Sequence, residues 1–395
     1  MALAHPTQRL LIQYLEPSPA VDSLEPSEAR DHLAHAFDRL PVTDLALGWR
    51  LRPALIEAVR SVVPSGVTVW RWVPVFVDSG EARAVDGLVA VGPGGQTPPP
   101  FRDMADFRFL CLDHEEVVEA GLERSIALAH EIVADGVLLD RIRWHSPSQD
   151  PSAELTCFCE QSRRAATKDG LDLTRVGQHV MAMAATSDGR RTLASALLGA
   201  APDERLSEFL DWRSATVTRA VGRLAEGLRA AGLRAALDVF TPALTRSVGQ
   251  DLSVLGPLGE WSKSMTYFEA LGPAAMPFEL AGYARWLQAA AEPDAAGFLA
   301  DALGFAPPGV GARGVQLDAL DHETTALAEA IGRERSIVGV DAVEIPGVCE
   351  VDQDDLDARS RSLRAAGVGS SPCWELLLIS EQRTECIARA WAAQA

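Results

Sequence analysis

The sequence is poor in cysteine and has no long hydrophobic run. Its 395 residues include six cysteines, too few for the disulfide frameworks of small secreted domains. No stretch of about 18 consecutive apolar residues occurs, which argues against a membrane-spanning helix. Residues 1–8, Met-Ala-Leu-Ala-His-Pro-Thr-Gln, lack the basic region and apolar core of a secretory leader. These absences predict a cytoplasmic protein with reduced thiols and no membrane partner.

Basic residues are scarce relative to acidic ones. Lysine and arginine number 36 against 55 aspartates and glutamates, so the formal net charge is -19. Such a charge repels the phosphate backbone of nucleic acids. We therefore expect a small-molecule or oligosaccharide partner and no nucleic acid, and a homodimer is left open. The 47% of hydrophobic residues suffice for the core of a large α/β domain.

Several motifs for metal, cofactor or nucleophile chemistry are missing. Cys157 and Cys159 form the one close cysteine pair, and no second pair follows at the spacing of a zinc site. The eight histidines are scattered. The chain has no Gly-x-Ser-x-Gly elbow, no phosphate-binding Gly-x-x-x-x-Gly-Lys loop and no His-Glu-x-x-His pair. The sequence therefore predicts no metal site and no cofactor.

What the chain does contain is an alternation of short apolar segments with amphipathic helices. Helices are predicted at 115–134, 206–231 and 353–366. The predicted strands are 9–16, 43–50, 67–77, 136–144, 233–240, 260–268, 337–345 and 372–379. Eight strands alternating with helices predict a (β/α)8 TIM barrel as a single domain over 1–395. A doubly wound open sheet is the alternative, but no Gly-x-Gly-x-x-Gly follows the first strand.

Two excursions interrupt the regular spacing. Residues 78–112 include a Gly- and Pro-rich turn region, and residues 145–205 separate the fourth strand from its helix. The longer excursion contains helical patches. An insertion of that size after a strand end is usually a lid or the wall of a binding site.

The fourth predicted strand carries the strongest functional signal. Its apolar run ends in Asp140, and Arg141, Arg143, Trp144 and His145 follow. Because active sites of such barrels form at the C-terminal ends of the strands, Asp140 is a candidate catalytic residue. An aspartate that caps a helix or pairs with an arginine is the alternative interpretation.

Similar side chains end the other predicted strands. Carboxylates and tryptophans at one rim are typical of a sugar site, because indoles stack on pyranose rings and paired carboxylates perform acid/base chemistry. The candidate catalytic residues are Asp140, Asp238 and Glu375. Glu16 ends the first strand. The candidate substrate-binding residues are Arg143, Trp144, His145, Lys263, Tyr267, Trp374, Trp72 and Glu344.

Strand periodicity predicts how the two aspartates lie. Leu138 and Asp140 share one face of their strand, as do Ala236 and Asp238. Adjacent strands lie roughly 4.8 Å apart, so matched heights would give the separation of about 5–5.5 Å found in retaining glycosidases. The wider separation of about 6.5–9.5 Å in inverting enzymes remains open.

Short motifs resemble known sugar-cleaving barrels. The stretch Gly136-Val-Leu-Leu-Asp140 resembles the Gly-x-Arg-x-Asp element of the α-amylase clan, in which the Asp is the nucleophile. Asp140-Arg-Ile-Arg143-Trp is similar to a stretch of uncharacterised glycoside-hydrolase-like barrels, as is Cys157-Phe-Cys159. Leu138 replaces the arginine of the clan, and Asp238 stands where a glutamate is usual.

These observations predict a glycoside hydrolase or transglycosidase. Asp140 would attack the anomeric carbon, and Asp238 would protonate the leaving oxygen and then activate water. Glu375 is the substitute acid/base if the register of the fifth strand differs. Two alternatives remain open. One is a barrel isomerase, epimerase or lyase that uses Lys263 and the same carboxylates for proton transfer, and the other is a non-catalytic sugar-binding barrel.

Overall fold

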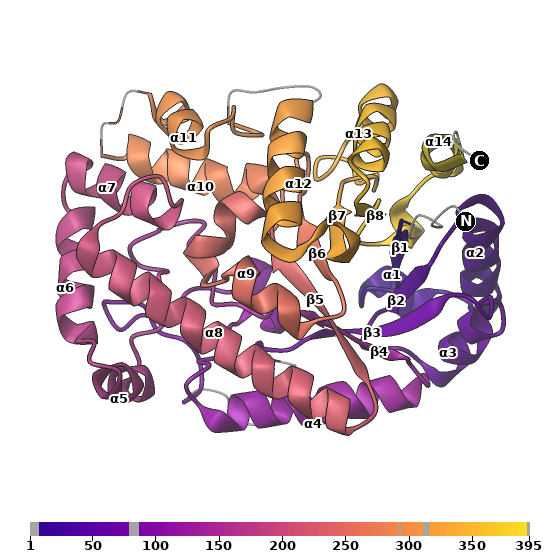
Figure 1. Ribbon diagram of the computed structural model, residues 1–395, viewed down its shortest axis with the longest axis horizontal. Helices are drawn as coiled ribbons and strands as arrows, with labels where there is room; N and C mark the ends of the chain where they lie inside the picture. The colour runs from indigo at the N-terminus through magenta and orange to yellow at the C-terminus, as the bar shows by residue number, and fades with distance from the viewer. Residues whose placement is uncertain (1–7, 79–86, 291, 293, 311–315, 393–395) are drawn as a thin grey trace, which may run out of the picture.

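The computed structural model describes residues 8–78, 87–290, 292, 294–310 and 316–392. Within them, eight parallel strands are hydrogen-bonded in chain order (Figure 1). Two predicted segments lie partly outside the described residues. They are residues 1–7 of the N-terminal stretch, in which no secretory leader is expected, and residues 79–86 of the first excursion. The strands are β1 Leu11–Tyr14, β2 Asp44–Leu47, β3 Thr68–Pro74, β4 Gly136–Asp140, β5 Arg234–Phe240, β6 Ser262–Met265, β7 Ser336–Gly339 and β8 Gly369–Ser371.

The first and last strands meet and close the sheet. Leu10 forms a parallel bridge with Ser370, and the Ser370 backbone N–H donates to the Arg9 carbonyl at 2.9 Å. The result is an α/β TIM barrel, which confirms the predicted fold class. A closed sheet of this kind leaves no strand edge unpaired along its circumference.

Helices surround the barrel and bury its outer face. They are α1 Pro19–Ser23, α2 Pro26–Arg39, α3 Pro53–Arg60, α4 Glu115–Glu131, α5 Glu160–Lys168, α6 Leu173–Ala184, α7 Ser187–Leu197, α8 Glu204–Ala230, α9 Leu252–Leu255, α10 Met276–Gln288, α11 Ala295–Leu303, α12 Leu317–Ile331, α13 Gln353–Ala366 and α14 Glu381–Ala392. Six short 3-10 helices occur among the described residues: η1 Phe101–Asp103, η2 Ala105–Phe107, η3 Pro242–Val248, η4 Gly256–Leu258, η5 Arg333–Arg335 and η6 Leu376–Leu378. The predicted helices at 115–134, 206–231 and 353–366 correspond to α4, α8 and α13.

The barrel interior is packed by tryptophans below the functional end. Trp70 and Trp72 are two residues apart on β3, so both point into the barrel. Leu138 of β4 and Ala236 of β5 belong to the same buried cluster. The rings of Trp70 and Trp261 meet edge to face at 5.0 Å. Because these side chains fill the interior, a cavity at the C-terminal ends of the strands lies above them and does not continue through the barrel.

The observed strands are shorter than predicted, and the eighth lies elsewhere. β4 ends at Asp140 because Arg141 adopts a left-handed backbone conformation with φ 54°, which takes the chain out of the sheet. The eighth strand is Gly369–Ser371 rather than 372–379. Pro372 has no N–H for the ladder, and the apolar run that follows it forms η6, capped by the Glu375 side chain.

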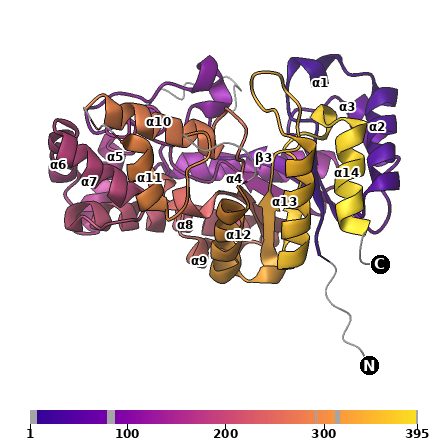
Figure 2. The same cartoon turned by 90° about the horizontal axis from the view of Figure 1, so that it is seen from above.

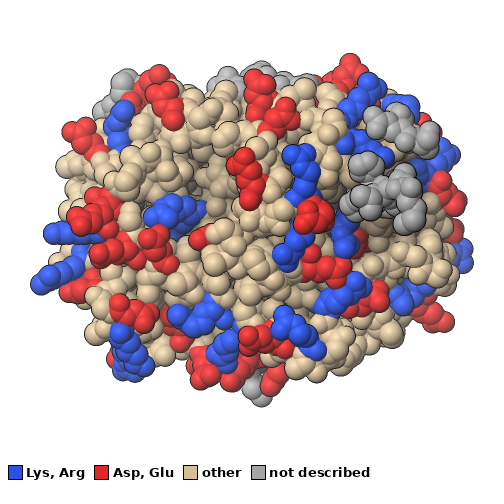
Figure 3. All heavy atoms as spheres, in the orientation of Figure 1, with Lys and Arg blue, Asp and Glu red and all other residues tan. Residues whose placement is uncertain are grey.

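The excursion after β4 lies on one side of the molecule. Its helices α5, α6 and α7 gather with α10 and α11, away from α2, α3 and α14 (Figures 1 and 2). On the face drawn in Figure 3, basic and acidic side chains are interspersed. Among the described residues, no helix combines the length and apolar character required to cross a bilayer.

Candidate active site

A cavity of about 170 Å³ opens at the C-terminal ends of the strands. Its lining combines charged and aromatic side chains from six different strands or the loops after them. The charged residues are Glu16, Asp140, Arg141, Arg143, Asp238 and Lys263, and the aromatic residues are Trp72, Phe107, Tyr267 and Trp374. A small apolar-walled cavity with several convergent polar groups is the usual form of a ligand site.

Asp140 and Asp238 occupy matched heights on neighbouring strands. β4 and β5 pair in the register Leu138 with Ala236 and Leu139 with Leu237, so the next residues in this register are Asp140 and Asp238. Both aspartates line the cavity, as the period-two alternation predicted. Asp140 accepts hydrogen bonds from the Trp72 indole at 3.1 Å and from the backbone N–H of Arg141. These contacts hold one carboxylate in a defined orientation at the cavity wall.

Asp238 forms a buried ion pair with Lys263. The Lys263 Nζ donates to Asp238 Oδ2 at 3.0 Å, while Asp238 Oδ1 has no hydrogen-bond partner among the described residues. Burial raises the pKa of Asp238 well above its ordinary value; Lys263 opposes this shift, and the nearby Asp140 charge adds to it. Asp238 is therefore a carboxyl group that can hold a proton near neutral pH and has one oxygen free for a ligand.

Strained backbone lies beside two of the cavity carboxylates. Arg141, next to Asp140, has φ 54°, and Leu15, next to Glu16, has φ 64°. Non-glycine residues in this region cost about 1–3 kcal/mol each and cluster at functional sites. Arg141 also stacks over the Phe107 ring at 4.4 Å, which keeps its guanidinium at the cavity rim.

Glu16 is a third cavity carboxyl with a shifted pKa. Burial raises the pKa of Glu16 to about 7; Arg141 lowers it, and Asp140 raises it. The sequence placed Glu16 at the end of the first strand, but did not include it among the candidate catalytic residues. Its pKa makes it a second group that can exchange a proton near neutral pH.

Arg143 lines both the main cavity and a smaller one of about 20 Å³. The Arg143 guanidinium lies between the Phe109 and Phe240 rings, at 4.4 and 4.3 Å. His145 lines the smaller cavity. Burial, followed by the Arg143 charge, lowers the pKa of His145 to about 3, so its imidazole is neutral across the physiological range.

Several buried polar atoms of the cavity are unsatisfied. Asp238 Oδ1, the Tyr267 hydroxyl and Arg141 Nη1 have no hydrogen-bond partner among the described residues. Arg141 Nη1 lies within ion-pair distance of Asp106 and Asp140, at 3.8 and 3.9 Å. Asp238 Oδ1 and the Tyr267 hydroxyl are free to form hydrogen bonds with a polar ligand.

Three of the predicted site residues lie elsewhere. Glu375 is buried and accepts hydrogen bonds from the backbone N–H groups of Leu15, Glu16 and Leu377. Its carboxylate therefore fixes the loop after β1, and the residue is absent from the described cavity lining. Glu375 was the expected substitute acid/base only if the register of the fifth strand turned Asp238 away from Asp140. The observed register places Asp238 beside Asp140 at the cavity, so this substitution is not needed.

Trp144 and Glu344 are the other two. The Trp144 side chain is 0% exposed and donates from its indole to the Arg213 carbonyl at 3.3 Å. After the left-handed turn at Arg141, its side chain packs against α8 and the end of η3 instead of lining the cavity. Glu344 is half-exposed and lies 3.7 Å from Arg383. Neither residue is in the described lining.

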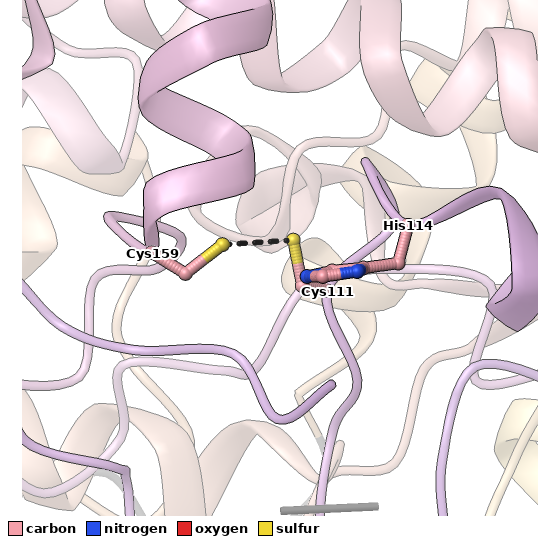
Figure 4. Close-up of side chains that lie close together, drawn as sticks. All are labelled: Cys111, His114 and Cys159. Atoms are coloured by element: carbon pink, nitrogen blue, oxygen red, sulfur yellow. Dashed lines mark hydrogen bonds between the residues drawn. The ribbon is translucent and has the colours of Figure 1, made fainter. Parts of the chain in front are cut away.

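The structure also brings together residues that the sequence analysis left apart. One ligand atom from each of Cys111, His114 and Cys159 lies within 4.8 Å of the others (Figure 4). The expectation of no metal site rested on the absence of a second cysteine pair. The signal that was missed is Cys111-x-x-His114, which precedes α4 and contains a histidine in place of the second cysteine.

No known protein family matches the chain by sequence, and no curated protein sequence does so either. Similarity is found among solved structures. The PgaB (BpsB) glycoside hydrolase domain from Bordetella bronchiseptica superposes with a TM-score of 0.59 and 13% identity, covering 99% of this chain and 100% of that domain. A chitinase from Chromobacterium violaceum has a TM-score of 0.45 and 11% identity, covering 98% and 100%. The likeness to the Bordetella domain is one of fold.

Proposed function

We propose that the protein is a glycoside hydrolase or transglycosidase acting on a glycan or glycoside. The observation that carries the proposal is the pair Asp140 and Asp238, at equal height on adjacent strands and facing one cavity. The two aspartates lie in different environments, which supports different roles for them, Asp140 as nucleophile and Asp238 as acid/base. Asp238 is paired with Lys263 and has a raised pKa. Two carboxyl groups with different proton affinities are what glycosidic cleavage requires.

The reaction proceeds in two steps in the retaining version. Asp140 attacks the anomeric carbon while Asp238 gives its proton to the leaving oxygen, so that a glycosyl ester forms as the glycosidic bond breaks. Asp238, now ionised, takes a proton from water, whose oxygen attacks the same carbon and releases Asp140. In transfer, a sugar hydroxyl replaces the water. The nucleophile role of Asp140 is the part of the proposal that agrees with the resemblance to the α-amylase clan.

The remaining lining supports a sugar as the ligand. Trp374 and Tyr267 meet edge to face at 5.1 Å and present aromatic surface on which a pyranose ring can stack. Arg143 and the unpaired Tyr267 hydroxyl provide hydrogen-bond donors for ring hydroxyl groups. We assign Trp72, Trp374, Tyr267, Arg143 and Lys263 to substrate binding. His145 would contact a substituent that reaches the smaller cavity.

The test is cleavage of a panel of activated aryl glycosides, followed by rescue of a nucleophile variant. Asp140→Gly should be inactive, and azide should restore release of the aryl group by entering the vacated space. The glycosyl azide should have the opposite anomeric configuration to the substrate. Glu344→Gln is the control and should behave like the wild type. A fully active Asp140→Gly variant would refute the assignment.

A second candidate function rests on Lys263. Its ammonium group is buried in the cavity and paired with Asp238, an arrangement that also suits proton transfer next to a carbonyl in an isomerase, epimerase or lyase. Incorporation of deuterium from solvent beside the carbonyl of a sugar, without cleavage of aryl glycosides, would favour this reaction.

We also propose a reducing, cytoplasmic location. All six cysteines lie within the described residues and are free thiols, which agrees with a compartment where disulfides are rare. A homodimer remains a prediction, which light scattering of the purified chain would test.

A further inference from the structure

A cluster of thiols and one imidazole joins the two excursions that follow β3 and β4. Cys111 and His114 lie just before α4, whereas Cys157 and Cys159 lie just before α5. The Cys111 and Cys159 sulfurs are 3.4 Å apart, and Figure 4 shows the His114 ring extending toward Cys111. The described lining of the candidate active site includes none of these four residues.

The spacing of the sulfurs fits shared coordination of a metal ion. Two thiolates bound to one tetrahedral zinc at about 2.3 Å lie about 3.8 Å from each other. A disulfide would bring the sulfurs to about 2.05 Å. The observed 3.4 Å is close to the metal-bound spacing, and a small outward movement of either side chain would reach it.

The sulfur of Cys157 is the candidate fourth donor, after the sulfurs of Cys111 and Cys159 and the imidazole of His114. Cys157 lies two residues before Cys159, beside the three ligand atoms of Cys111, His114 and Cys159 that lie within 4.8 Å of one another, and a movement of its side chain toward them completes a set of four. Its sulfur also accepts hydrogen bonds from the backbone N–H groups of Val91 and Cys159, both at 3.4 Å. These backbone donors hold the Cys157 sulfur in place in the loop before α5.

The surroundings of the other two ligands are also suited to a metal. Cys159 is the N-cap of α5, and its sulfur accepts the Ser162 backbone N–H at 3.3 Å, where the helix dipole favours negative charge. The Nδ1 atom of His114 lies 3.4 Å from a Glu116 carboxylate oxygen. A carboxylate beside one ring nitrogen is the usual arrangement of a metal-binding histidine, whose other nitrogen is the ligand.

We propose that Cys111, His114, Cys157 and Cys159 bind a structural zinc ion. Three sulfurs and one imidazole nitrogen are a donor set that zinc prefers and that calcium and magnesium do not. Because protein ligands fill all four positions, the ion has no open site for substrate and serves to fix the chain. It links the loop before α4 to the start of α5, and so holds the excursion after β4 against the barrel.

The first experiment measures metal content. The full chain is produced in zinc-supplemented medium, purified without a metal-affinity step, and analysed for zinc and iron. We expect about one zinc and no iron per chain. Cys111→Ser and His114→Ala should each lose most of the zinc. Cys386→Ser is the matched control, because Cys386 is also a buried free thiol but lies in α14, and it should keep the zinc.

A second measurement uses the wild-type chain, in case a ligand variant does not fold. Removal of zinc with a strong chelator should lower the melting temperature by several degrees, and zinc but not magnesium should restore it. Cobalt(II) added to the apoprotein should produce the intense near-ultraviolet absorption of cobalt–thiolate bonds. Aryl glycoside cleavage is measured separately. A chain without zinc therefore leaves the proposed glycosidase activity untouched, and a chain without that activity leaves the proposed zinc site untouched.

Three results would overturn the proposal. The first is wild-type protein without zinc whose melting temperature does not respond to zinc. The second is a disulfide between Cys111 and Cys159 in protein kept under non-reducing conditions, found by mass spectrometry. The third is stoichiometric iron with the absorption of an iron–sulfur cluster in place of zinc.

Discussion

Lys263 and Asp238 form an ion pair of 3.0 Å in which the two side chains are only 1% and 2% exposed. Taking both charges out of water is costly, and such a pair is seldom retained for stability alone. Its position on β5 and β6, at the floor of the cavity, places the lysine where it tunes the proton affinity of the candidate acid. Lys263 lowers the pKa of Asp238, against the larger effect of burial.

Replacing Lys263 should therefore move the pH dependence of activity. In Lys263→Met the lowering effect is lost, so the pKa of Asp238 rises. Because the acid must be protonated, the alkaline limb of the kcat/KM profile should shift to higher pH. Lys263→Arg keeps the charge and should shift the limb less. An alkaline limb that stays in place in Lys263→Met would mean that Asp238 is not the acid.

Asp140 should be required for chemistry but not for folding. Asp140→Asn removes the nucleophile while keeping the size of the side chain, so turnover of a cleavable aryl glycoside should fall to background. The melting temperature should stay level or rise, because removing a charge from a strained site often stabilises a protein. Turnover and thermal melting are the two measurements. A variant with near wild-type turnover would contradict the role.

Glu375 should be required for stability rather than for chemistry. Glu375→Ala leaves backbone N–H groups of Leu15, Glu16 and Leu377 without their acceptor. At about 1–3 kcal/mol for each buried unsatisfied group, the free energy of unfolding should fall by at least about 3 kcal/mol. Glu344→Ala, at a half-exposed carboxylate, should change it by less than about 0.5 kcal/mol. Urea unfolding compares them, and equal stability of the two variants would be inconsistent with this role.

Glu16 should make the protein less stable as the pH rises. Burial raises its pKa from 4.5 to about 7 in the folded chain, so the folded state binds the proton more tightly than the unfolded state. The contribution of Glu16 is fully present below its unfolded pKa and is lost as the pH rises through about 7. Urea unfolding at pH 5 and pH 8 should show a smaller difference for Glu16→Gln than for wild type. Glu57→Gln, at an exposed helical position, should leave the difference unchanged.

Local sequence patterns were enough to predict the barrel and its central pair. Apolar runs of strand length between amphipathic helices specify a closed parallel sheet, because each element can bury its apolar face in that arrangement. Period-two alternation placed Asp140 and Asp238 above Leu138 and Ala236, since side-chain direction along a strand depends only on position. Both inferences use interactions between residues close in sequence.

Tertiary structure decided where the chain leaves each strand and what each side chain meets there. After the left-handed turn at Arg141, Trp144 lies in the core, and Gly369–Ser371, with little strand propensity of its own, forms β8 because β7 and the residues before β1 pair with it. Glu375 accepts two hydrogen bonds from a loop at the other end of the chain. Cys111 meets Cys159 only after two excursions have folded together. These contacts join residues far apart in sequence, and their geometry depends on loop conformations that local patterns do not encode.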